Sequence, residues 1–232
     1  MKDSRAEEEI REGDRVTSTV EDLGRLPDSF RALNEGDPFA IGIGFKITPE
    51  GLVLDEDLKR YFESLGGKIW DPKEIKIEKD RAIEEIIEQI ASDYRNSLLM
   101  QNHPNAAHQI FGEIRRYKLE DPETDHGQYD DRLPHVDFIP PNDPCFVFFF
   151  TGSRATSFWE GDFEYKGNLH QSYEDAIKGM LKRDYPSGHL YRSKEARTLM
   201  HASPTDFKEG EMRTLGRLYV GPNPSGVTTT SS

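Results

Sequence analysis

The sequence predicts a mainly β domain, a sheet sandwich or barrel, with supporting helices on one face. Amphipathic helical patterns occupy the N-terminal half of the 232-residue chain. Short β-type segments separated by Gly, Pro and Asp turns occupy the C-terminal half. Hydrophobic residues make up only 34% of the chain, and aromatic residues alone make up 10%, so we expect a largely aromatic core.

Two N-terminal segments have the periodicity of amphipathic helices. The first spans Asp55–Leu65 and ends at Gly66-Gly67, a pair that stops a helix. The second runs from about Asp80 to Leu99, with apolar residues at i, i+3, i+4 and i+7. Its apolar stripe comprises Ile83, Ile86, Ile87, Ile90 and Tyr94, and its outer face carries Glu84, Glu85 and Glu88. We interpret it as a supporting helix packed on a sheet.

The C-terminal half contains four β-type segments and one further helical pattern. The β-type segments are Cys145–Thr151, Ala155–Tyr165, Ala196–Met200 and Arg213–Val220. Gly152-Ser153 is expected to form a hairpin turn between the first two. The helical pattern begins at Ser172 as N-cap, and its apolar side chains run to Leu181. Helices are therefore expected mostly N-terminal to the β core.

We interpret residues 16–220 as a single domain, with a β core over about 115–220. Residues 1–15 are charged without an apolar stripe and are expected to be mobile. Residues 221–232 run through Pro222 and Pro224 into Thr-Thr-Thr-Ser-Ser and are expected to be a disordered tail.

Charge and composition exclude several classes of partner. The formal net charge of -13 repels phosphate backbones and anionic membrane surfaces, so we expect no nucleic-acid or membrane partner. Basic residues between Lys182 and Arg197 are interrupted by acidic ones and are interpreted as a solvated surface. No apolar run approaches the ~20 residues of a membrane-spanning helix.

The expected compartment is the cytoplasm. Cys145 is the only cysteine, which excludes an internal disulfide and fits a reducing compartment. The N-terminus is acidic and lacks the apolar core of a secretory signal.

The motif with the clearest chemical meaning is His135-Val136-Asp137. In an extended strand, residues two apart project from the same face, so this imidazole and carboxylate can bind one metal ion together. The pattern is common by chance, and a metal site needs a third ligand. His201 is the candidate, because it lies where an apolar β-type run gives way to Ser203-Pro204. Two histidines and one carboxylate form the facial triad of non-haem iron(II) oxygenases.

An arginine that could bind a carboxylate follows the second histidine. Arg213 comes twelve residues after His201 at the start of the last β-type segment. Its guanidinium can bind a carboxylate through two parallel hydrogen bonds. Arg217 is an alternative, because strand alternation places it on the same face as Arg213.

The order and spacing of His135, Asp137, His201 and Arg213 resemble those of the 2-oxoglutarate/Fe(II)-dependent dioxygenases. The resemblance covers about Leu133 to Val220 and includes the apolar run Phe146–Phe150. It implies a double-stranded β-helix, a jelly-roll of two antiparallel sheets with iron at its open mouth. His189 is the alternative second histidine, but neither Arg197 nor Arg213 follows it at the family's interval.

The resemblance also implies an activity. His135, Asp137 and His201 would hold Fe(II), and Arg213 would bind the far carboxylate of 2-oxoglutarate, which reacts with O2 to give succinate and CO2. Family members that chlorinate have a small residue in place of the carboxylate, so Asp137 favours hydroxylation, desaturation or ring formation. We expect a small-molecule substrate, whose identity stays open, as does the oligomeric state.

Two other interpretations stay open. A cupin-like metal-binding or sensory module would use the same three ligands without oxygen chemistry. A catalytically inactive scaffold would keep its biological role after His135→Ala.

Overall fold

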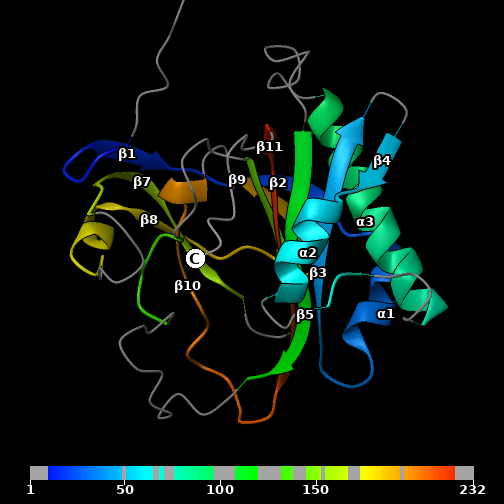
Figure 1. Ribbon diagram of the computed structural model, residues 1–232. Helices are drawn as coiled ribbons and strands as arrows, with labels where there is room; N and C mark the ends of the chain where they lie inside the picture. The colour runs from blue at the N-terminus through cyan, green and yellow to red at the C-terminus, as the bar shows by residue number, and fades with distance from the viewer. Residues whose placement is uncertain are drawn as a thin grey trace, which may run out of the picture.

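The computed structural model describes residues 10–48, 51–64, 68–70, 76–96, 108–119, 132–137, 145–152, 155–166, 173–193 and 196–222. The protein is mainly β, as predicted, and its strands form one seven-stranded and one four-stranded sheet. Every pair of named strands is antiparallel. Figure 1 shows the helices on one side of the large sheet and the small sheet on the other. No helix among the described residues is long and apolar enough to cross a membrane.

The large sheet is built around its C-terminal strand. Its order is β2 (Glu21–Arg25), β9 (His189–Ser193), β6 (Cys145–Phe150), β11 (Met212–Pro222), β5 (His108–Lys118), β3 (Phe39–Thr48) and β4 (Gly51–Leu54). β11 pairs with β5 along its whole length and with β6 on its other edge. Successive β11 side chains point to opposite faces, so the strand contributes to two separate cores.

The small sheet is centred on β7 (Ser157–Glu164). It also contains β1 (Arg15–Ser18), β8 (Leu181–Arg183) and β10 (Met200–Ala202). Phe158 is paired with His201 of β10 and with Arg183 of β8, so β7 lies between these two strands. An isolated antiparallel bridge joins His135 to His201 and adds the His135 segment beyond β10.

The chain alternates between the two sheets from β5 onward. After β5 it passes to the His135 segment in the small sheet, returns through β6, and continues to β7 and β8. It then enters β9, β10 and β11, which belong to the large, small and large sheet in turn. The expected hairpin at Gly152-Ser153 is therefore wrong, because β6 and β7 lie in different sheets. Ser153 itself lies outside the described residues.

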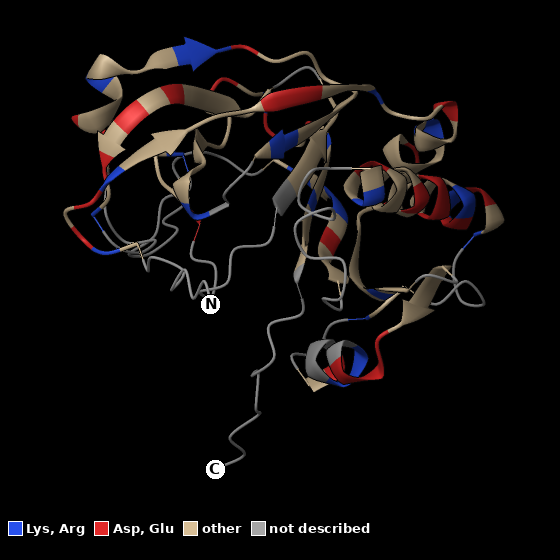
Figure 2. Ribbon diagram, turned by 90° about the horizontal axis from the view of Figure 1, so that it is seen from above, with Lys and Arg blue, Asp and Glu red and all other residues tan. Residues whose placement is uncertain are grey.

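Helices cover the outer face of the large sheet. They are the short turn η1 (Asp28–Phe30) with α1 (Arg31–Asn34), α2 (Glu56–Ser64) and α3 (Ile77–Asn96). The predicted apolar stripe of α3 is buried at every position, and it packs with Ile43 and Ile110 in one core. The three glutamates are exposed, as predicted, and Figure 2 shows acidic residues along this helix. Leu99 and Gly66-Gly67 lie outside the described residues.

Aromatic side chains fill the space between the sheets, but the largest core, under the helices, is mainly aliphatic, so the expected aromatic core is found only between the sheets. Phe148 of β6 stacks on Phe158 of β7 with ring centroids 4.7 Å apart, and on Tyr191 of β9 at 5.2 Å. Phe150 belongs to the same cluster. On the outer face of the small sheet, Trp159 and its neighbours form a third apolar cluster.

Several N-terminal strands were missed by sequence analysis. The N-terminal half contains β1 to β4 as well as helices, and β5 begins at His108, before the predicted β core. In β3, Ile41 and Ile43 alternate with Gly42 and Gly44. The alternation of apolar and polar side chains that indicates a strand is therefore absent there. β5 carries charged residues on the face away from the helices, which hid its alternation. β9 was also missed.

Two predicted elements are wrong in type. The helix expected over 172–181 is only a 3₁₀ turn, η2 (Ala176–Gly179), followed by β8, which pairs with the edge of β7. Gly179 disfavours continuation of the turn as a helix. Ala196–Thr198 forms another 3₁₀ turn, η3, and the strand begins only at Met200. His201 therefore lies inside β10, not at its end. Ser172 lies outside the described residues.

Parts of both end segments that were expected to be mobile or disordered are attached to the two sheets. Gly13 donates a backbone hydrogen bond to Tyr165, and Tyr165 donates one to Asp14, so this part of the predicted mobile segment is attached to the small sheet. β11 extends to Pro222, into the predicted tail. Residues 1–9 and 223–232 lie outside the described residues.

Gly216 provides a test of packing in the centre of the large sheet. A Cβ at this position would lie 2.2 Å from the buried ring of Phe149. We expect Gly216→Ala to lower the free energy of unfolding by about 1–3 kcal/mol, because the ring cannot move within a packed core. Gly179→Ala is the control, since a Cβ there meets nothing within 4 Å. Urea unfolding would measure both, and equal stability of the two variants would contradict this account of the packing.

Candidate metal centre

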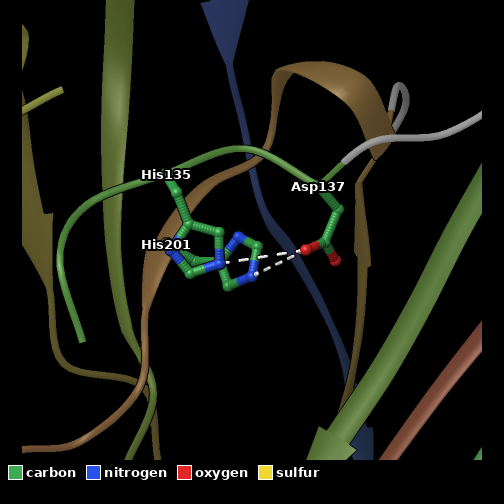
Figure 3. Close-up of side chains that lie close together, drawn as sticks. All are labelled: His135, Asp137 and His201. Carbon is green, nitrogen blue, oxygen red and sulfur yellow. Dashed lines mark ion pairs between the residues drawn. The ribbon is translucent and has the colours of Figure 1, made fainter. Parts of the chain in front are cut away.

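The structure brings His201 to His135 and Asp137, which lie more than sixty residues earlier in the chain. One ligand atom from each lies within 4.8 Å of the others, and this is the cluster of metal-ligating side chains found among the described residues. Figure 3 shows both imidazoles and the carboxylate pointing toward one another. His135 and Asp137 are buried, and His201 is partly buried.

Backbone pairing places the two histidines side by side. The His135 amide donates to the His201 carbonyl over 2.9 Å, and the His201 amide donates back over 3.0 Å. This reciprocal pair brings the Cα atoms of directly opposed residues to about 5.5 Å. The two rings are accordingly 4.3 Å apart between centroids. Within β10, Met200 and Ala202 belong to the outer apolar cluster, so alternation directs His201 between the sheets.

Each imidazole is held in one tautomer by a carbonyl two residues earlier. Nδ1 of His135 lies 2.7 Å from the Leu133 oxygen, and Nδ1 of His201 lies 2.9 Å from the Leu199 oxygen. A carbonyl only accepts hydrogen bonds, so each Nδ1 carries the proton of the neutral ring. The Nε2 lone pairs are left facing Asp137. Metal-binding histidines are commonly oriented by this kind of bond.

The distances between ligand atoms suit a shared cation. Asp137 Oδ1 lies 3.8 Å from His135 Nε2 and 3.7 Å from His201 Nε2. These separations exceed hydrogen-bond length but lie within reach of two ligands about 2.1 Å from a common ion. Asp137 Oδ2 is buried and has no hydrogen-bond partner among the described residues. Since burying a carboxylate oxygen without a hydrogen bond is costly, the donor set fits a bound divalent metal.

Positive charge surrounds the Asp137 carboxylate. Burial raises its pKa, but the electrostatic effect of neighbouring basic groups, Arg217 among them, outweighs burial and holds the pKa below its ordinary value. Arg217 Nη1 lies 3.6 Å from Asp137 Oδ2. Burial lowers the pKa of Arg217, whereas Asp137 raises it, and the net pKa is raised. The carboxylate is therefore ionised and ready to act as a ligand.

Arg213 and Arg217 both project from β11 into the space between the sheets, but their contacts differ. Arg213 is 2% exposed, donates from Nη2 to Thr156 Oγ1 and lies over the Phe150 ring at 5.6 Å. Arg217 Nη2 instead donates to Glu113 Oε1 over 2.9 Å. Sequence analysis did not identify Thr156 or Glu113. The β11–β5 register, which pairs Arg217 with Glu113, is the signal that identifies the latter.

His189, the alternative second histidine, lies outside the cluster. Its Nδ1 is 2.9 Å from Asp22 Oδ2, which joins β9 to β2 at an edge of the large sheet. The structure therefore separates His189 from His135 and Asp137, and brings His201 to them.

No protein-family model and no curated protein matches the chain. Among solved structures, the crystal structure of IDO from Bacillus thuringiensis is similar, with a TM-score of 0.47 and 9% sequence identity. The match covers 80% of this chain and 75% of that one. A likeness at this level carries no argument about fold or function.

The three ligands should be needed for metal binding. We expect His135→Ala, Asp137→Ala and His201→Ala each to weaken Co(II) binding by at least about 100-fold, because changing a residue that only orients a ligand already costs about 10–100-fold. Calorimetric titration would measure the affinity, and circular dichroism would check folding. His189→Ala is the matched control and should bind Co(II) as the wild type does. Tight binding by all three variants would exclude this site.

Proposed function

We propose that the protein is an Fe(II)- and 2-oxoglutarate-dependent oxygenase that hydroxylates, or otherwise oxidises, a small molecule. The observation that carries the proposal is the convergence of His135, Asp137 and His201, since two histidines and one carboxylate are the facial set of non-haem Fe(II) oxygenases. This set occupies one side of a metal ion and leaves positions for a cosubstrate and O2. The strongly acidic chain favours a small molecule over a nucleic acid.

The strand order supports a double-stranded β-helix. A jelly-roll has eight strands in two antiparallel sheets, and its chain crosses repeatedly between them. From β5 to β11 this chain alternates in that manner, and β5, β11, β6 and β9 face the His135 segment, β10, β7 and β8. The proposed metal ligands come from two adjacent segments of the small sheet, and the arginines come from the large sheet opposite.

The contacts of the two arginines favour Arg213 as the residue that binds the cosubstrate. Arg217 is engaged by the carboxylates of Glu113 and Asp137. Arg213 instead donates to the Thr156 hydroxyl and lies over the Phe150 ring. A carboxylate entering this buried position would meet the guanidinium fork together with the Thr156 hydroxyl. We therefore assign the far carboxylate of 2-oxoglutarate to Arg213 and Thr156.

The proposed reaction balances without another reductant. When bound, Fe(II) and 2-oxoglutarate supply the oxidising chemistry with O2. The bond between C1 and C2 of 2-oxoglutarate breaks to release CO2, one oxygen atom enters succinate, and the other enters a C–H bond of the substrate. The protein contributes ligation by three side chains, orientation by Arg213 and exclusion of water by the aromatic core. Asp137 fills the third ligand position, which favours hydroxylation over halogenation.

Succinate release tests the proposal against a metal-binding or sensory module. Purified protein with Fe(II), ascorbate, O2 and 2-oxoglutarate should form succinate slowly without a substrate, and His201→Ala should abolish this activity because a ligand is lost. Chromatography of the products would measure it, with His189→Ala as the active control. Metal binding without succinate formation, even with candidate substrates, would favour the cupin-like module.

Arg213 should control the affinity for the cosubstrate. We expect Arg213→Gln to raise the half-saturating 2-oxoglutarate concentration by about 30-fold or more, since losing one partner of a buried charged pair costs about 2 kcal/mol or more. Arg213→Lys should recover part of the affinity, because charge returns without the fork. Arg192→Gln, which changes an ion pair with Glu21 away from the centre, is the control. A larger effect from Arg217→Gln than from Arg213→Gln would reverse the assignment.

A further inference from the structure

A second cationic group lies beside the proposed metal centre. Strand β5 places Glu113 and Arg115 on the face that points away from the helices, because Ile110 and Ile114 occupy the helix-facing core. The register sets Glu113 directly opposite Arg217 of β11. Arg217 in turn reaches Asp137, a proposed ligand. Arg217 therefore borders the metal centre from the large sheet, and Arg115 lies on the other side of Glu113 from it in the same ion-pair network.

One carboxylate is shared between these two guanidiniums. Glu113 Oε1 lies 2.9 Å from Arg217 Nη2 and 3.6 Å from Arg115 Nε. The Nε atoms of both arginines are buried and have no hydrogen-bond partner among the described residues. Both side chains nevertheless stay about one-third exposed, at 34% for Arg115 and 31% for Arg217. Glu113 is shared by both guanidiniums and Asp137 is a proposed metal ligand, so these partly exposed arginines can also bind a small anion.

We propose that Arg115 and Arg217 bind a carboxylate of the substrate and thereby hold it next to the metal. The inference rests on the proposed function and names its substrate class: a small molecule with a carboxylate group. Among the described residues, the guanidiniums of Arg115 and Arg217 share the carboxylate of Glu113, and a guanidinium fork binds a carboxylate through paired hydrogen bonds.

Aromatic side chains on the same face would contact the rest of the substrate. Phe111 and Tyr219 stack at 5.1 Å on the far side of the Arg217–Glu113 pair, and both are partly exposed. Arg115 lies over the Tyr117 ring at 4.7 Å, which fixes the plane of its guanidinium. Planar fixed guanidiniums beside apolar rings suit an organic acid with an apolar or aromatic body.

A pair of probes that differ in charge alone tests the inference. The full-length protein would be titrated with 3-phenylpropionate and with its neutral amide, first alone and then with Co(II) and 2-oxoglutarate, which occupies Arg213. We expect the acid to bind at least about tenfold more tightly than the amide, as hydrogen bonds to charged groups allow. Calorimetry would measure binding, and broadening of the probe's NMR signals after Mn(II) replaces Co(II) would place the acid near the metal.

Variants of the two arginines and of Glu113 should move the preference for the acid in opposite directions. Arg115→Gln and Arg217→Gln should each remove most of it, whereas Glu113→Gln should strengthen binding of the acid, because it removes the competing carboxylate while keeping a similar shape. Arg192→Gln should leave the preference unchanged. Equal binding of acid and amide by the wild type, no binding of the acid, or retention of the preference in both arginine variants would overturn the inference.

The two proposals fail separately. Succinate formation without a preference for the acid would reject the carboxylate site and keep the oxygenase. A preference for the acid without succinate formation would reject the oxygenase and keep the carboxylate site.

Discussion

The reciprocal backbone pair between His135 and His201 is the constraint on which the candidate centre depends. It joins two segments more than sixty residues apart and holds their imidazoles 4.3 Å apart between centroids. Because side chains alternate along an extended segment, the same pairing brings Asp137 to the same face as His135. Carbonyls two residues upstream then set both tautomers, so local backbone alone prepares two nitrogen ligands. A slip of one residue in this register would dismantle the centre.

The two faces of the large sheet carry different kinds of residue: one packs in the apolar core, and the other carries charged side chains. On one face, α3 buries an isoleucine stripe against β3, β5 and β11 in the largest apolar core. On the other face, β5 and β11 present arginines and a glutamate toward the small sheet. β11 serves both, since Leu218 packs under the helices while Arg213 and Arg217 face the centre. Packing of the helices on one face thus keeps rigid the strands whose other face carries these charged groups, which would be poorly fixed on a loop.

Buried charges are the unusual feature of the space between the sheets. Asp137 is buried next to Arg217, and an ordinary fold would gain little from such a pair, because the desolvation of both groups offsets their attraction. The two buried charges would be stabilised further if a metal ion bound the carboxylate and an anionic substrate bound the guanidinium. Arg213, near the start of β11, is likewise buried, against Thr156 and the Phe150 ring.

The sequence by itself determined the features that depend on near neighbours. The α3 stripe follows from helical periodicity, and His135 with Asp137 follows from two-residue alternation, so both could be predicted from the local pattern. Tertiary structure alone decided the partners across strands. The contacts of Arg217 with Glu113 and of Arg213 with Thr156, and the passage from β6 to β7 between sheets, join segments whose register is set by the whole sheet. No local pattern encodes such pairings, because they depend on how all the apolar faces are buried together.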